Sequence, residues 1–216
     1  MSFLTIMSQL GSGFLTTLLI FCLTLVFSLP LGLLVCFGRM SKFTPLRLVV
    51  KFLISILRGT PLMLQLLVVY FGPYYVARLP LSGSWRFWAV VIGFSVNYAA
   101  YFAEIYRAGI EGIPAGQHEA ARVLGYTRRQ TFLKIVFPQM VKRVMPPVTN
   151  EVITLVKDTS LAYAVSYIEM FTIAKQIAAA QTTIMPLFAA GIFYYVFNFV
   201  VAWGMERIEK ALAYYQ

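Results

Sequence analysis

Four long stretches of the chain contain no charged residue, and they constrain the fold more than any other feature. They run from Met1 to Gly38, Gly59 to Ala77, Phe87 to Ala103 and Gln176 to Met205. A helix needs about 20 mostly apolar residues to cross a bilayer, so each stretch is near or above the required length. Only 12% of the 216 residues are charged, against roughly 25% in an ordinary soluble domain. The sequence therefore predicts an all-α membrane protein.

The basic residues produce a formal net charge of +10, and their placement favours a membrane protein over a nucleic-acid-binding one. Most of them follow the first and the third apolar stretch, whereas only Arg78, Arg86 and Lys175 lie in the alternate connections. An excess of Lys and Arg marks cytoplasmic loops. This pattern places the N-terminus outside and the C-terminus, with Arg207 and Lys210, in the cytoplasm. The number of spans must then be odd.

Five transmembrane helices in a single domain (residues 1–216) satisfy this requirement. We predict them at 14–38, 52–76, 86–108, 144–166 and 184–205, with one long cytoplasmic loop at 109–143. The fourth span is the weakest on hydropathy because Glu151, Lys157 and Asp158 lie inside it. It is retained because an even number of spans would place the basic C-terminal tail on the wrong side of the membrane.

The cytoplasmic loop contains signals for two short helices. Residues 117–124 are followed by Gly125 at the position of a C-terminal cap. Thr127 and Gln130 then form a capping-box pattern that begins a second helix. Pro138 should disturb this second helix, because proline cannot donate a backbone hydrogen bond.

Five blocks of sequence occur in order along nearly the whole chain. They are Arg58–Leu62 with Gln65, Tyr98–Ile110, Pro114–Ala121, Leu124–Gly125 with Phe137–Gln139, and Lys157–Leu161. Together they resemble the permeases of polar amino acid ABC importers, which have the type I importer fold. Five ordered blocks are far more specific than one motif.

The resemblance implies a dimeric permease of the bacterial cytoplasmic membrane, driven by a separate ATP-binding cassette ATPase. The chain has no G-x-x-x-x-G-K-[ST] sequence, so it supplies no phosphate-binding loop. It would be a transport subunit without enzymatic activity and without a bound cofactor, since ATP and magnesium would be held by the ATPase. An external substrate-binding protein, an amino acid and membrane lipid would be its other partners. The implied ATPase-coupling residues are Gly116, Glu119, Ala120, Ala121, Leu124 and Gly125.

Polar residues within the spans are the candidates for substrate binding. An ionisable residue near the bilayer centre costs on the order of 3 kcal/mol, so Asp158 requires a partner or a water-filled cavity. We predict that Asp158 and Asn97 bind the ammonium and polar groups of an amino acid, assisted by Thr159, Ser160 and Gln65. The alternative for Asp158 and Asn97 is interhelical hydrogen bonding and ion pairing that only hold the bundle together.

Four residues at the inner ends of the second and third spans have predicted gating or structural roles. Pro61 should kink the second span, and Arg58 stands just before it. The alternative for Arg58 is that its charge reaches the inner lipid headgroups. Glu104 and Arg107 are three residues apart, which predicts a local ion pair.

Two other functions remain possible on the sequence alone. An ion-coupled secondary transporter would use Asp158 or Glu104 for coupling, but such proteins usually show an internal repeat, which this chain lacks. A structural membrane subunit would need no transport machinery. His118 is the only histidine and has no partners at ligand spacing, so we predict no metal site.

Overall fold

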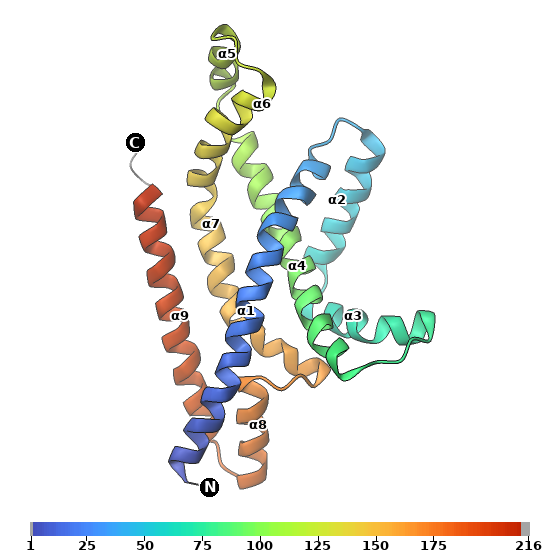
Figure 1. Ribbon diagram of the computed structural model, residues 1–216, viewed down its shortest axis with the longest axis vertical. Coiled ribbons are helices and arrows are strands. Elements are labelled where there is room, and N and C mark those ends of the chain that lie inside the picture. The colour runs from blue at the N-terminus through green and yellow to red at the C-terminus, as the bar shows by residue number, and fades with distance from the viewer. Residues whose placement is uncertain (1, 213–216) are drawn as a thin grey trace.

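The computed structural model describes residues 2–212, and all regular structure within them is helical. The elements are α1 (Phe3–Arg39), α2 (Thr44–Gly59), α3 (Leu62–Ala77), α4 (Gly83–Glu111), α5 (Ala115–Val123), α6 (Arg128–Thr131), a π turn (Phe132–Val136), α7 (Phe137–Asp158), a 3-10 segment (Thr159–Val165), α8 (Met170–Gln181) and α9 (Met185–Leu212) (Figure 1). The predicted all-α fold is confirmed.

Three helices, α1, α4 and α9, are each long and apolar enough to cross a membrane. The pair α2 and α3 adds a fourth span if the two helices are counted together. Helix α7 is less apolar than these helices, because it contains five charged residues: Lys142, Arg143, Glu151, Lys157 and Asp158. Its 22 residues would nevertheless extend about 33 Å, enough to cross a bilayer. It packs against α4 and α9, which are both apolar spans.

Two of the predicted spans have a different shape from the one expected. In the span predicted at 52–76, the kink expected at Pro61 is a complete break, because α2 ends at Gly59, α3 begins at Leu62 and their directions differ by 112°. Thr60 is extended, with φ −119° and ψ 149°, since the ring of Pro61 disfavours helical geometry at the preceding residue. The span predicted at 144–166 is α-helical only as far as Asp158, where α7 ends, and the chain then continues as the 3-10 segment Thr159–Val165.

The cytoplasmic loop was predicted more closely. Thr127 and Gln130 form the reciprocal hydrogen bonds of a capping box at the start of α6. Pro138 does disturb the helix that follows: the chain passes through the π turn at residues 132–136 just before the proline. The helical path nevertheless continues, so α6, the π turn and α7 form one uninterrupted connection from the loop into the bundle.

The core is centred on the contact between α1 and α4 (Figure 1). The buried face of α1 includes six small residues: Gly13, Thr17, Thr24, Ser28, Gly32 and Cys36. Small residues at helix interfaces allow two backbones to approach closely in a membrane. A Cβ atom placed on Gly32 would lie 2.8 Å from the Cβ of Phe102 on α4. The residue at position 32 must therefore be glycine for α1 to keep its distance from α4.

Replacing Gly32 by valine should destabilise the protein by about 1–3 kcal/mol or more, since extra methyl groups in a packed core force the backbone to shift. A Cβ atom on Gly11, in the same helix, would meet no described atom within 4 Å, so Gly11→Val is the matched control. Thermal unfolding of the purified protein in detergent measures the difference. Equal melting temperatures for the two variants would contradict the close α1–α4 contact.

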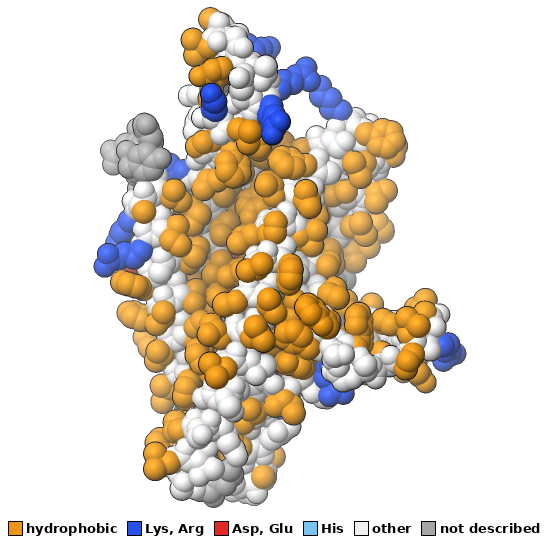
Figure 2. Space-filling model, in the orientation of Figure 1, with side chains coloured by type: hydrophobic (Ala, Val, Ile, Leu, Met, Phe, Trp, Pro, Cys, Tyr) orange, Lys and Arg blue, Asp and Glu red, His pale blue; other side chains and the backbone are white. Residues whose placement is uncertain are grey.

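The two ends of the bundle differ in character. The N-terminal end of α1 lies beside α8, while α5, α6 and the C-terminal end of α9 lie toward the opposite end (Figure 1). Lys and Arg side chains gather around α5 and α6, and the middle of the visible face is largely hydrophobic (Figure 2). Since the first and last long helices place their outer ends at opposite ends of the molecule, the fold fits an odd number of crossings.

Candidate functional site

The break between α2 and α3 is held by two predicted site residues, Gln65 and Asn97. The Gln65 Nε2 atom donates to the Leu57 carbonyl at 2.8 Å and to the Thr60 carbonyl at 3.1 Å. Asn97 Nδ2, on α4, donates to the same Leu57 carbonyl at 3.1 Å and to Gln65 Oε1 at 2.9 Å. The break frees these backbone carbonyls, and the two amides satisfy them. In this geometry Asn97 forms interhelical hydrogen bonds, which was the alternative to substrate binding at this residue.

Asn97→Ala should lower the free energy of unfolding by about 1–3 kcal/mol, because it removes a buried hydrogen-bond donor from a freed carbonyl. Ser95→Ala is the control on the same helix, since the buried Ser95 hydroxyl has no hydrogen-bond partner among residues 2–212 and its removal should not destabilise the protein. Thermal unfolding in detergent compares the two variants. An equal effect at both positions would show that the amide network does not stabilise the break.

Asp158 lies at the C-terminal end of α7, and its Oδ2 atom accepts a hydrogen bond from the Tyr98 hydroxyl at 2.7 Å. Tyr98 is only 2% exposed, whereas Asp158 is half-buried. Tyr98 and Asn97 are neighbours on α4, so their side chains point about 100° apart. Asn97 therefore faces the α2–α3 break and Tyr98 faces α7, and the structure does not bring Asn97 and Asp158 into one site.

The two predicted hydroxyl groups that follow Asp158 are engaged with the helix itself. Thr159 donates to the Val156 carbonyl at 2.7 Å, and Ser160 donates to the Lys157 carbonyl at 2.8 Å. Both hydroxyl protons are thus used, and only the oxygen lone pairs remain for a ligand cation. Thr159 is fully buried, so Asp158 and Ser160 are the accessible members of this group.

Tyr98 is a site residue that the sequence did not single out. It lies within the block at residues 98–110, but an aromatic residue on an apolar helix is most simply interpreted as packing. Tyr98 and Asp158 are 60 residues apart and lie in different helices, so no local sequence pattern links them. Only the packing of α4 against α7 reveals the pair.

A network of charged side chains occupies the far end of α4. Glu104 contacts Arg39 of α1 at 3.3 Å and Arg107 at 2.6 Å, which is the ion pair that the three-residue spacing predicts. Arg107 also pairs with Glu111. Arg58 lies over the ring of Tyr101, 5.1 Å from its centre. Arg58, Glu104 and Arg107 border an open pocket of about 460 Å³, so the lining of this pocket is partly charged.

Helix α5 stands at the tip of the molecule and covers little of its own chain (Figure 1). Its C-terminus is closed by a Schellman motif: Tyr126 N donates to the Ala121 carbonyl, and Gly125 N donates to the Arg122 carbonyl, both at 3.0 Å. Gly125 has a φ of +76°, as this motif requires. The predicted glycine cap is therefore present.

The predicted coupling residues do not all face outward. Gly116, Glu119, Ala120, Leu124 and Gly125 are exposed, whereas Ala121 is fully buried on a helix that packs against the chain's own π turn. Ala121 can therefore provide close packing only within the chain. Val123 is 88% exposed and Leu124 71% exposed. The sequence interpretation omitted Val123, which adds to the apolar surface of α5.

Glu169 is a second buried acid that the sequence interpretation missed. It is fully buried at the N-terminus of α8, where its carboxylate accepts hydrogen bonds from the Phe171 and Thr172 amides at 2.8 and 2.7 Å. The hydroxyls of Tyr194 on α9 and Thr17 on α1 also donate to it, at 3.1 and 3.4 Å. The signal available in the sequence was an acidic residue, Glu169, at the N-cap position of a helix. Glu169 ties three helices together and has no capacity left for a ligand.

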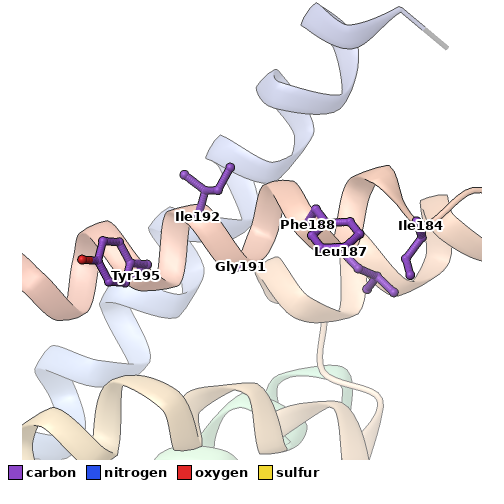
Figure 3. Close-up of a pocket in the computed structure, with 6 residues that line it drawn as sticks. All are labelled: Ile184, Leu187, Phe188, Gly191, Ile192 and Tyr195. Carbon is purple, nitrogen blue, oxygen red and sulfur yellow. The ribbon is translucent and has the colours of Figure 1, made fainter.

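The outer face of α9 carries a shallow apolar hollow of about 430 Å³ (Figure 3). Its lining comes from this one helix and the residue that precedes it: Ile184, Leu187, Phe188, Gly191, Ile192 and Tyr195. Such a surface suits lipid or another apolar helix, because it offers almost no hydrogen-bonding groups. It is not a site for a polar substrate.

Comparison with known proteins agrees with this architecture. Residues 28–214 match the family described as "Binding-protein-dependent transport system inner membrane component". The chain is 38% identical to the octopine transport system permease protein OccM of Rhizobium radiobacter, over 87% of this chain and 80% of the relative. It is 35% identical to the arginine transport system permease protein ArtQ of Bacillus subtilis, over 93% and 90%.

Solved structures share the fold over nearly the whole chain. An amino acid ABC transporter with histidines is similar with a TM-score of 0.86 and 28% identity, covering 98% of this chain and 99% of the other. The MetNI methionine ABC transporter has a TM-score of 0.75 at 19% identity, covering 99% and 100%, and this second likeness bears on the fold alone. The chain belongs to the family of inner membrane components of binding-protein-dependent transport systems.

Proposed function

We propose that the chain is a permease subunit of an amino acid importer driven by ATP, and that it acts as a dimer with an identical or related permease. A separate ATPase subunit would bind and hydrolyse ATP with magnesium, and an external binding protein would deliver the substrate. The relatives named for octopine, arginine and cystine transport support an amino acid as the substrate class.

The exposed α5 helix is the observation that carries this proposal. It presents Val123 and Leu124 at the tip of the molecule, next to the exposed carboxylate of Glu119. Glu119 has no ion-pair partner among residues 2–212. An apolar patch beside an unpaired charge is suited to a protein partner, since such a partner can cover the apolar patch and form an ion pair with the charge. The ATPase is that partner.

The proposed orientation places α5 and the C-terminal end of α9 in the cytoplasm and the N-terminal end of α1 outside. The basic side chains around α5 and α6 support it (Figure 2), because Lys and Arg favour the cytoplasmic side. Within the membrane, Asp158 would attract the ammonium group of the substrate and Ser160 would assist. Gln65 and Asn97 would act on the α2–α3 break and thereby on the shape of the path.

Uptake by the reconstituted complex tests the proposal. Proteoliposomes with the permease, its co-purifying ATPase and the binding protein should accumulate at least one member of a panel of radiolabelled amino acids only when ATP is present. Uptake driven by an ion gradient without ATP would favour a secondary transporter. A permease that purifies without any ATP-binding partner would contradict the proposed coupling, and absence of transport from an assembled complex would favour a structural subunit.

A further inference from the structure

A basic pocket lies between the α1–α2 connection and α5. It has a volume of about 530 Å³, and it is lined by Lys42, Ile110, His118, Arg122, Tyr126, Arg128, Thr131, Phe132 and Val136. These residues come from four separate parts of the chain: the α1–α2 connection, the end of α4, the α5 region, and α6 with the π turn. The pocket therefore joins α5, the proposed ATPase-coupling helix, to the α1–α2 connection.

The charge of this pocket is unbalanced. Lys42, Arg122 and Arg128 are cationic, and none of the nine lining residues is acidic. None of these three cations forms an ion pair with an acid within residues 2–212. The nearest acids in sequence are Glu111, which pairs with Arg107, and Glu119, which is exposed on α5. Three uncompensated cations at one hollow attract an anion.

The other wall of the pocket is apolar. Ile110, Phe132 and Val136 contribute it, and Val136 is only 2% exposed. Lys and Arg side chains adjoin the hydrophobic surface of the bundle in this region (Figure 2). A free inorganic anion would use only the charged wall. A phospholipid uses both walls, because its phosphate carries the negative charge and its glycerol and first acyl carbons are apolar.

We propose that this pocket binds the phosphate of an anionic phospholipid from the inner leaflet and thereby links α5 to the α1–α2 connection. The inference rests on the proposed orientation, which places α5 at the cytoplasmic surface. Tyr126 supplies a hydroxyl donor for a phosphate oxygen. Basic pockets on the cytoplasmic side of membrane helices recognise anionic headgroups. The bound lipid would hold the coupling helix at a fixed height above the membrane.

Lys42→Gln and Arg128→Gln test the pocket, and Arg129→Gln is the matched control. Arg129 lies on the same short helix as Arg128 but does not line the pocket. The complex is placed in phosphatidylcholine nanodiscs with a minority of phosphatidylglycerol, and the lipid retained after partial delipidation is measured by native mass spectrometry. Each substitution should weaken phosphatidylglycerol retention about fivefold and the pair roughly 25-fold, since one basic residue near the surface contributes about 1 kcal/mol.

Three outcomes would overturn the inference. Unchanged retention in the double variant would show that these cations do not bind lipid. Competition by inorganic phosphate at the affinity of the lipid would assign the pocket to a free anion. Loss of the ATPase from the double variant, with lipid retention unchanged, would assign the cations to the protein partner. If the lipid is retained as expected but no ATPase co-purifies with the unaltered chain, the proposed function fails and the lipid site stands.

Discussion

Gly125→Val should abolish ATP-dependent transport while the protein still inserts into the membrane. Gly125 has a left-handed backbone with φ +76°, which costs a residue with a Cβ atom roughly 1–2 kcal/mol. A valine there would open the Schellman motif that ends α5, and the surface that carries Leu124 and Glu119 would lose its shape. ATPase stimulation by substrate-loaded binding protein, measured in proteoliposomes, should fall to the basal rate.

Gly125→Asn is the control for backbone conformation, because asparagine tolerates the left-handed region better than other residues. A Cβ atom at this position meets nothing within 4 Å in the part of the chain that the structure describes, so no steric clash there confounds the comparison. Asparagine should therefore retain most of the transport activity. Full coupling in the valine variant would contradict the proposed role of α5.

Asp158→Asn should reduce transport about tenfold to a hundredfold, as expected for the loss of a hydrogen bond to a charged group worth about 1.5–3 kcal/mol. Asparagine has nearly the same size and can still accept the hydrogen bond from Tyr98. Removal of a charge from the membrane should not destabilise the chain, because the charge itself is costly there. Initial rates of uptake and the melting temperature of the complex, measured together, separate these effects.

Tyr98→Phe is the companion variant for this pair. It removes the hydrogen bond at 2.7 Å and leaves the carboxylate, so stability should fall while much of the transport activity is retained. If the complex of the Asp158→Asn variant instead dissociates, the Tyr98–Asp158 pair only holds α4 to α7. The alternative of interhelical hydrogen bonding without substrate contact is then correct. If Asp158→Asn transports at the normal rate, the carboxylate does not contact the substrate.

The long helices were predictable because hydropathy depends only on local sequence. Charge-free stretches located α1, α4 and α9, although α1 begins at Phe3 instead of residue 14 because Ser2 caps it. The position of the break at Pro61 was also predictable, since proline restricts its neighbour. Its size was not: the 112° turn depends on the amides of Gln65 and Asn97, which lie in different helices.

The candidate site was predictable in composition but not in arrangement. Polar residues in the spans were identified, yet Asn97 and Asp158 lie toward different faces of α4, and Tyr98 is the residue that reaches Asp158. The side on which each residue lies follows from how α4 packs between other helices, which no local pattern encodes. Glu169 was missed for the same reason, because its partners are spread over α1, α8 and α9.

The buried carboxylate of Glu169 also has a consequence for how the chain is made. Its contact with Thr17 joins residues 152 positions apart, and Tyr194 is still later in the chain. During synthesis, α1 enters the membrane before α4, α8 and α9, with the hydroxyls of Thr17, Thr24 and Ser28 along one face. That face meets α4 only when the middle of the chain emerges, and Thr17 reaches its acid only near the end. Helix α1 therefore completes its contacts long after it is translated, and a chain truncated before α8 should remain a substrate for membrane proteases.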